Sequence, residues 1–450
     1  MSRDLMQDAA ARGIRYLESL RTRPVRPDPA AVEQLSAGWG GAMPPEPADD
    51  HEVLRLLDEL GTPATMAMAG PRFFGFVIGG ALPVTVAANW LATAWDQNTG
   101  RQSVTPATAT LERISLGWMV ELFGLPAGTG GAFVTGATVA NTTALAAARH
   151  TVLAKAGWDV ESQGLFGAPP IQVVVGEEVH PTVLKGLGLL GLGRDRVRIV
   201  PVDGQGRMRA DALGKLDALT ILCIQAGNLN TGAFDPAAEI VPRARQAGAW
   251  VHVDGAFGLW AAASSELAHL CAGVEQADSW ATDAHKWLNV PYDSGLAFVR
   301  DPEALRLAMA VRASYLPSGA PREPADYTPE LSRRGRGVEV WAALRSLGRS
   351  GLAAMLEASC RQARRFAESL SAAGYEILND VVLNQVMVSF GTPEKTERVI
   401  AALQADGTCW CGGTLWQGRT AMRISVCCWA TTDQDVELSL EAMKRIAATV

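Results

Sequence analysis

The chain has 450 residues, of which 48% are hydrophobic and 19% are charged, a composition typical of globular proteins and unlike that of disordered ones. Its formal net charge of −7 argues against a general nucleic-acid binder, because such proteins usually carry a basic surface. No apolar run reaches the roughly 18 residues that a membrane span needs. The charged N-terminus also lacks the apolar core of a secretory signal, so we expect neither a membrane protein nor a secreted one.

The first 22 residues have the pattern of an amphipathic helix, and a proline-rich stretch follows them. A helix followed by an extended segment at a terminus suggests an arm that lies on another subunit. We assign residues 1–60 to this arm, residues 61–325 to a large domain and residues 326–450 to a small domain. A chain of this length is expected to divide in this way.

From residue 132 onward, short runs of apolar and β-branched residues alternate with helical stretches. Runs of this kind are typical of parallel strands that are buried on both faces, so we predict an α/β domain with a mostly parallel seven-stranded sheet. In such sheets ligands bind at the carboxyl ends of the strands, which is where functional residues should lie. The predicted strands cover residues 132–135, 171–175, 198–202, 219–224, 250–253, 279–281 and 295–299.

Residues 312–337 interrupt this alternation, because they are rich in proline, glycine and charged residues. We predict a long exposed loop there, and long loops in compact domains often have a function. The chain then becomes helical, with strand-like runs at 382–389 and 421–427 and a final helix over 433–449. This order predicts a small α+β domain at the C-terminus.

Four segments that follow predicted strands carry candidate functional residues. Gly136, Ala137 and Thr138 stand at a strand-to-helix turn whose free N–H groups could bind an anion, although ordinary turns look similar. Asp254 follows the strand 250–253, where it could meet a positive group of a ligand or simply cap a helix.

The other two segments carry basic side chains. Lys286 lies among apolar and small residues just after another strand, which makes it a candidate Schiff-base nucleophile, whereas most lysines lie on the surface. His180 follows the strand 171–175 and could stack on a flat cofactor or be a structural histidine. Together, a phosphate turn, an aspartate, a histidine and a lysine fit one ligand, pyridoxal 5′-phosphate (PLP).

The seven cysteines form no repeated CxxC, and this usage favours a reducing compartment, so we expect a cytoplasmic protein. Cys409 and Cys411 form a CxC, while Cys427 and Cys428 are adjacent, and a metal site built from these four is the alternative to free thiols. Zinc ligands usually follow a different spacing, so we favour buried thiols and expect no metal.

The segments HVDGA and DAHKW, with GPRFFGF at 70–76 and TPATATLE at 105–112, resemble the group II PLP-dependent amino-acid decarboxylases. This family includes aromatic-L-amino-acid, glutamate and diaminobutyrate decarboxylases. The resemblance runs over nearly the whole chain and implies the aspartate-aminotransferase fold, also called PLP fold type I. It also implies a homodimer that exchanges its N-terminal arms and has its active sites at the subunit interface.

The resemblance further implies roles for individual residues. Lys286 would hold the cofactor, Asp254 would pair with the pyridine nitrogen, and His180 and Ala256 would lie on opposite faces of the ring. The phosphate would be bound by Ala137, Thr138 and His285. Family members commonly have threonines where this chain has GNLNTG, and Asn228 and Asn230 are expected to replace their hydrogen bonds.

The resemblance also implies that Tyr327, in the loop, would protonate the substrate Cα, with His180 as the alternative donor. Pro71 and Phe73 would shape the substrate pocket. We therefore expect decarboxylation of an L-amino acid, with an aromatic or apolar side chain favoured. The alternatives are another PLP-dependent carbon–carbon lyase, such as a retro-aldol enzyme, and a decarboxylation-dependent aldehyde synthase. A non-enzymatic PLP-binding protein is disfavoured because Lys286, Asp254 and His180 are all present.

Overall fold

The computed structural model describes residues 2–311 and 322–450. The chain forms two compact units, which are described separately. Unit 1 contains the residues up to Gly80 together with Arg365–Leu378 and Met387–Val450, and unit 2 contains Ala81–Arg364 and Asn379–Val386. The unit boundaries thus lie near residues 80 and 364, while the sequence had suggested 60 and 325. The residues of the expected arm group with the C-terminal residues of the same chain.

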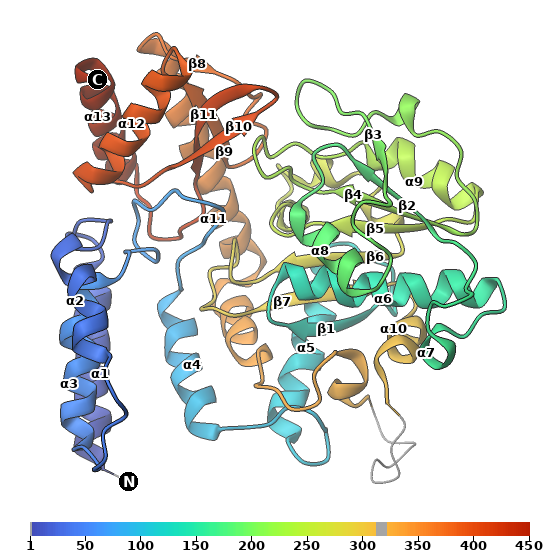
Figure 1. Cartoon of the computed structure of the whole chain (residues 1–450), viewed down its shortest axis with the longest axis horizontal. Coiled ribbons are helices and arrows are strands. Elements are labelled where there is room, and N and C mark those ends of the chain that lie inside the picture. Colours follow the sequence, from blue (N-terminus) through green and yellow to red (C-terminus); the bar gives the residue numbers. More distant parts are fainter. Residues whose placement is uncertain (1, 312–321) are drawn as a thin grey trace. The chain divides into compact units, whose positions relative to one another are not determined.

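Unit 2 is built on a seven-stranded sheet with the strand order β1-β7-β6-β5-β4-β2-β3 (Figure 1). All seven strands predicted from the sequence are present, with ends that differ by at most a few residues. Five neighbouring strands are parallel, whereas β7 runs antiparallel to both β1 and β6. The strands are β1 (Gly130–Val134), β2 (Gln172–Gly176), β3 (Arg198–Val200), β4 (Thr220–Gln225), β5 (Trp250–Asp254), β6 (Ser279–Asp283) and β7 (Gly295–Val299). The prediction of a mostly parallel sheet is therefore confirmed.

Helix α6 (Ala137–Lys155) crosses the front of this sheet in Figure 1. It contacts β1, β4, β5, β6 and β7 as well as α8 and α10, and most of its alanines, including Ala140, Ala144 and Ala148, are buried. Small side chains let the helix approach the strands closely, so its first turn lies directly over the strand ends. The other helices of this part of the chain are α4 (Pro83–Trp95), α5 (Pro106–Leu122), α7 (Val160–Gln163), α8 (Pro181–Leu189), α9 (Ala237–Gln246), α10 (Pro302–Met309) and α11 (Gly337–Ala372), which continues into unit 1.

The prediction of one long exposed loop over 312–337 is wrong for its described part, residues 322–336. This stretch includes a short 3-10 helix, η5 (Pro324–Tyr327), and several of its residues are buried. The guanidinium of Arg333 is held by both carboxylate oxygens of Glu112, at 2.6 and 2.7 Å. A bidentate buried pair of this kind fixes the backbone, which composition alone could not reveal. Residues 312–321 lie outside the described residues.

Unit 1 combines helices from both ends of the chain with a four-stranded sheet of order β10-β11-β9-β8. The N-terminal helices α1, α2 and α3 pack on one another, and α12 packs on β11 and α13. The predicted final helix is confirmed, and Thr432 and Asp435 close its first turn in a reciprocal capping box. The elements are α1 (Arg3–Ser19), α2 (Pro29–Trp39), α3 (Asp50–Ala64), β8 (Glu376–Ile377), β9 (Gln385–Ser389), α12 (Pro393–Asp406), β10 (Gly412–Trp416), β11 (Arg419–Ser425) and α13 (Asp433–Thr449).

Candidate active site

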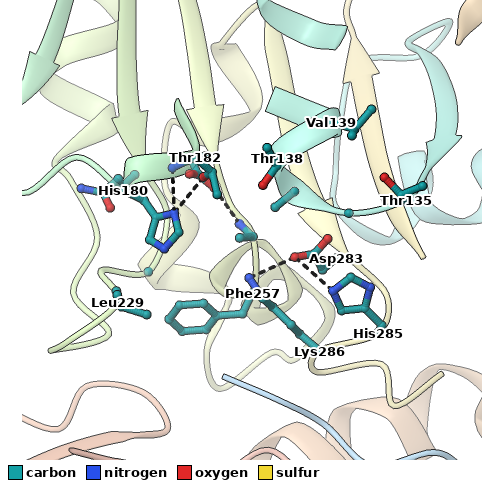
Figure 2. A pocket seen from close by; sticks show the side chains of 16 residues that line it. Thr135, Thr138, Val139, His180, Thr182, Leu229, Phe257, Asp283, His285 and Lys286 are labelled. Carbon is teal, nitrogen blue, oxygen red and sulfur yellow. Dashed lines mark hydrogen bonds and ion pairs between the residues drawn. The ribbon is translucent and has the colours of Figure 1, made fainter. Parts of the chain in front are cut away.

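A cavity of about 320 Å³ lies at the carboxyl ends of the parallel strands of unit 2. This is the edge at which an α/β sheet is expected to bind its ligand, and the volume is in the range of small-molecule sites. Figure 2 shows Lys286 in this cavity, with His180 on one side and Asp283 and His285 on the other. The candidate residues that line it are Gly136, Ala137, Thr138, His180, Asp254, Ala256, His285 and Lys286.

One end of the cavity is suited to an anion. Gly136 ends the turn after β1, and no described side chain caps the following helix, α6, so its first N–H groups face the cavity. A Cβ atom on Gly136 would lie 3.2 Å from Cε1 of His285 and 3.6 Å from Oδ1 of Asp283. Only glycine therefore fits here without displacing the side chains that surround this end.

His285 adds a donor to the same end. The backbone N–H of Ser294 donates to its Nδ1 at 3.0 Å, so the proton of the neutral ring must be on Nε2. Burial lowers the pKa of His285 and favours this neutral form, although the carboxylate of Asp283 opposes the shift. The ring of Tyr292 stacks on the imidazole with 4.3 Å between centroids, which fixes its plane. His285 thus directs an N–H toward the anion end.

Lys286 is paired with an acidic residue that the sequence analysis did not single out. Its Nζ lies 3.0 Å from Oδ2 of Asp283, and the exposed fraction of the lysine side chain is 20%. The other carboxylate oxygen of Asp283 is buried and has no hydrogen-bond partner among the described residues. The pairing explains how a mostly buried amine is held at the pocket floor. The only feature of the sequence that could have indicated this pair is that Asp283 comes three residues before Lys286.

Asp254 is held rigidly at the end of β5. Its Oδ2 accepts a hydrogen bond from the side-chain amide of Asn141 at 3.1 Å, and its Oδ1 accepts one from the backbone N–H of Ala256 at 3.2 Å. Both oxygens keep acceptor capacity, and the side chain lines the cavity. The arrangement suits a carboxylate that receives a proton-bearing group of a ligand.

His180 precedes α8 and serves as its N-terminal cap. Its Nδ1 lies 2.8 Å from the Thr182 hydroxyl and 3.3 Å from the Thr182 backbone N, whose N–H donates to it. Because a backbone N–H can only donate, Nδ1 is an acceptor and the ring proton is on Nε2. The imidazole lines the cavity, as does Ala256, and their predicted places on opposite faces of the cofactor ring stay a prediction.

Three predicted site residues of unit 2 do not line this cavity. The side chain of Asn228 accepts from the N–H groups of Asn230 and Thr231 and donates to Glu178, so it stabilises a turn. Asn230 lies in the same turn and outside the lining, while Gly227 and Leu229 of this segment do reach the cavity.

Tyr327 is the third of these residues. It packs on the apolar cluster that includes Leu145 and Leu305, and the guanidinium of Arg322 lies 4.1 Å from its ring centroid. These contacts hold it away from the cavity of its own chain, so its predicted role as a proton donor has no support from its position here.

Pro71 and Phe73 belong to unit 1. Phe73 is buried, and its ring stacks on Trp410 with 5.2 Å between centroids, while the carbonyl of Pro71 accepts a hydrogen bond from Thr431. Their role in substrate binding stays a prediction. All seven cysteines are buried and none is in a disulfide, and the described residues contain no cluster of three or more metal-ligating side chains.

A comparison with known families identifies the family of the chain. Residues 42–391 match the model of the pyridoxal-dependent decarboxylase conserved domain. The chain belongs to this family. The match covers most of the chain and includes every residue that lines the cavity.

Relatives and solved structures agree with the family. The chain is 26% identical to aromatic-L-amino-acid decarboxylase of Rattus norvegicus, over 97% of this chain and 95% of the relative. It is 27% identical to 4-hydroxyphenylacetaldehyde synthase of Rhodiola rosea, over 79% of this chain and 75% of the relative. A crystal structure of Oryza sativa TDC with PLP and tryptamine superposes with a TM-score of 0.90 at 21% identity, covering 100% of this chain and 99% of the other. These likenesses confirm the fold type I architecture.

The protein is thus a PLP-dependent amino-acid decarboxylase, and its pocket fits that cofactor. The glycine turn and the uncapped start of α6 could accept a phosphate, the lysine could bond to an aldehyde carbon, and the aspartate could face a pyridine nitrogen. The side chains missed by the sequence analysis include Asp283, Thr182 and Phe257, which line the pocket, and Asn141, which supports Asp254. Among the described helices, none is long and apolar enough to cross a bilayer.

Proposed function

We propose that this decarboxylase acts on an L-amino acid with an aromatic or apolar side chain and releases CO₂ and the corresponding amine. The observation that carries the proposal is the lining of the pocket. Leu229 and Phe257 add apolar surface to it, and among its described lining residues Lys286 is the only lysine or arginine. An acidic substrate side chain would require a further cation. The relative from Rattus norvegicus, an aromatic-L-amino-acid decarboxylase, supports the same substrate class.

Each residue of the pocket would have a separate role. Bound PLP supplies a protonated ring that withdraws electrons from the bond between Cα and the carboxylate. Lys286 would hold the cofactor covalently, and Asp254 would accept a hydrogen bond from the ring nitrogen and keep it protonated. The N–H groups of Ala137 and Thr138 and the Nε2–H of His285 would bind the phosphate.

His180 is the best-placed proton donor to Cα. Its proton is on Nε2, and its ring lies in the cavity, whereas Tyr327 does not reach it. His180→Asn should therefore slow amine formation by roughly 10²–10⁴-fold, the usual contribution of a positioned acid. Tyr327→Phe should have little effect on amine formation. If Tyr327→Phe instead blocks amine formation or diverts the product to aldehyde, Tyr327 is the donor, as the family resemblance implied.

The substrate class is tested by measuring CO₂ release from purified, PLP-loaded protein with each of the twenty amino acids and common aromatic derivatives. We expect release from aromatic or large apolar substrates and none from aspartate or glutamate. Lys286→Ala should abolish both CO₂ release and the visible absorption band of lysine-bound PLP. Preferential release from an acidic amino acid would contradict the proposed class.

A second candidate is decarboxylation coupled to oxidation, which gives an aldehyde. It is favoured by the similarity to 4-hydroxyphenylacetaldehyde synthase and by the position of Tyr327 outside the pocket. This reaction consumes the amino acid, O₂ and water and yields the aldehyde, CO₂, ammonia and H₂O₂. An oxygen electrode separates the two candidates, because simple decarboxylation takes up no O₂.

We also propose that the protein is a cytoplasmic homodimer. Several large apolar side chains of α4 are exposed in the single chain, including Trp90, Leu91 and Trp95, as expected of a surface that another subunit covers. The seven free cysteines support a reducing compartment. Light scattering coupled to size exclusion should give twice the chain mass, and a monomer at micromolar concentration would contradict the assembly.

A further inference from the structure

Behind the pocket, a buried side-chain amide contacts one of the two residues that would face the cofactor ring and is linked to the other through a threonine. Asn141, in the second turn of α6, donates from Nδ2 to Oδ2 of Asp254 at 3.1 Å. The same nitrogen lies 3.3 Å from the hydroxyl of Thr182, which in turn lies 2.8 Å from Nδ1 of His180. The two protons of one amide thus reach toward the aspartate and, through a threonine, toward the histidine.

A further line of hydrogen bonds fixes the orientation of this amide. His252 Nε2 lies 2.9 Å from Oδ1 of Asn141, and His252 Nδ1 lies 2.9 Å from the hydroxyl of Ser279. The indole N–H of Trp250 donates to the same hydroxyl at 2.9 Å. All of these side chains are buried, and Asn141, His252 and Ser279 have no exposed surface.

The direction of each hydrogen bond in this line follows from the chemistry of its two ends. An indole N–H can only donate and a carboxylate can only accept, so Asn141 must direct its NH₂ group toward Asp254 and its oxygen toward His252. His252 then carries its proton on Nε2, and Ser279 donates to Nδ1. Burial lowers the pKa of His252 to about 3, so the ring stays neutral with this single proton. The donors run in one direction from Trp250 to Asp254.

The branch through Thr182 is fixed in the same way. Its hydroxyl oxygen accepts from Asn141, so its proton is directed to Nδ1 of His180, which also faces the Thr182 backbone N–H. Nδ1 of His180 is therefore an acceptor, and the proton of the neutral ring is on Nε2.

We propose that Asn141 is a positioning residue of this decarboxylase, whose one amide orients the carboxylate of Asp254 and the imidazole of His180 together, with His252 holding the amide in the required orientation. The proposal rests on the function proposed above, because it assigns those two residues to the cofactor ring. If the amide were rotated by half a turn, its oxygen would face the carboxylate, and two acceptors would oppose each other in a buried site.

The test uses the full-length, PLP-loaded protein and four variants. Asn141→Leu replaces the amide with an apolar group of the same branched shape. His252→Leu removes the donor to the amide, whereas His252→Gln can keep an N–H near the position of Nε2. Thr143→Val is the matched control, because Thr143 is buried on the same helix and its hydroxyl has no hydrogen-bond partner among the described residues.

Two quantities are measured for each variant: the steady-state constants, and the ¹⁵N chemical shift of the ring nitrogen in protein loaded with ¹⁵N-labelled PLP. Asn141→Leu and His252→Leu should lower kcat by roughly 10- to 100-fold with a smaller change in KM, as typical for loss of a supporting contact. Both should also move the ring nitrogen toward its unprotonated shift. His252→Gln should restore both values toward wild type, and Thr143→Val should leave them unchanged.

The proposal is overturned if Asn141→Leu folds and keeps the wild-type shift and kcat, or if Thr143→Val changes them as much. Should Asn141→Leu fail to fold, the two His252 variants decide. If His252→Leu and His252→Gln have the same kcat and the same ring-nitrogen shift, the proposal is rejected. Failure of the proposed function looks different. A wild-type protein that releases no CO₂ while its ring-nitrogen shift still responds to Asn141→Leu would reject the reaction and keep the positioning role.

Discussion

Two carboxylates enter the pocket, and their surroundings differ. Both oxygens of Asp254 accept hydrogen bonds from the protein, so this group keeps one orientation before any ligand arrives. Asp283 has one oxygen paired with Lys286 and the other buried without a partner among the described residues. A buried acceptor without a partner is costly, and the surroundings of Asp283 would change if Lys286 bonds to the cofactor as proposed above.

This difference predicts an unusual effect of Asp283→Asn. The substitution removes the counter-ion of the free Lys286 amine and so destabilises the protein without cofactor. In the loaded protein the lysine nitrogen is no longer a free ammonium group, and a negative charge near the phosphate is removed. We therefore expect PLP to bind several-fold more tightly to Asp283→Asn, as measured by equilibrium dialysis. Each tenfold change in the dissociation constant of PLP corresponds to roughly 1.4 kcal/mol of binding free energy.

Asp235 provides the control for that experiment. It is a buried carboxylate of the same unit that accepts from the N–H groups of Met208 and Gln225, outside the pocket. Asp235→Asn should shift the melting temperatures of the loaded and the cofactor-free protein by similar amounts. Weaker PLP binding in Asp283→Asn than in wild type would contradict our reading of the carboxylate.

At this scale, the sequence predicted the residues that follow strands and missed those that support them. Lys286, Asp254 and His180 could be found because each comes after a β-rich run at the edge where ligands bind. Asn141 lies inside an alanine-rich helix, and its contacts with residues 252 and 254 depend on how that helix crosses the sheet. Sequence spacing carries no information on that crossing.

Among the elements, the start of α6 determines where an anion can bind. The helix has 19 residues, begins directly after Gly136 and has no described side-chain cap, so its first N–H groups are available to a ligand. Gly136 also leaves room for the His285 ring. The turn and the lysine segment therefore form one wall of the pocket even though they are distant in the chain.

Gly136→Ala is predicted to weaken PLP binding by roughly tenfold while the fold is kept. The added methyl group would lie 3.2 Å from Cε1 of His285, so the ring must move away from the anion end. Gly117→Ala is the control, because Gly117 lies in α5 and a Cβ there meets nothing within 4 Å. That change should leave PLP binding unaltered and slightly raise the melting temperature, since alanine favours helix over glycine. Equal PLP affinities for Gly136→Ala and wild type would exclude the anion end proposed here.

The strands were predictable and the segment 322–336 was not, and one physical difference explains both results. Strands such as Gly295–Val299 are apolar and buried along their whole length, and that pattern is local. The segment around Arg333 is polar, and it is buried only because Glu112, more than 200 residues earlier, neutralises it. Pairing between distant charges cannot be read from composition.

For the whole molecule, the buried histidine His252 links stability to pH. Its pKa is about 3 in the folded protein and near 6.5 when exposed, so between these values the unfolded chain binds a proton that the folded protein does not. Stability must therefore fall as the pH decreases through this window, by at most about 1.4 kcal/mol per pH unit for one proton.

His252→Gln should make the free energy of unfolding depend less steeply on pH between about pH 4 and 7. The slope, measured by urea unfolding, should decrease by at most the contribution of one proton. Asp235 provides a contrast of opposite sign, because burial raises its pKa to about 6 and its contribution to stability falls as the pH rises from 3.8 to that value. Asp235→Asn should thus gain stability relative to wild type toward neutral pH. If the free energy of unfolding of His252→Gln depends on pH as steeply as that of wild type, His252 is protonated in the folded protein.

The antiparallel strand β7 has a consequence for how the protein could be followed as it refolds. Its first residue, Gly295, pairs with Val134 on one side and Asp283 on the other, and a Cβ there would lie within 3 Å of the backbone of Gly136. One row of three residues thus aligns the phosphate turn with the lysine segment, although about 150 residues separate them in the chain. With the roles proposed above, PLP held by Lys286 could form its phosphate contacts at the Gly136 turn only after this row is in register. During refolding with PLP, the rate at which visible absorption appears would therefore report how fast these three strands come together. Far-ultraviolet circular dichroism would report helix formation separately.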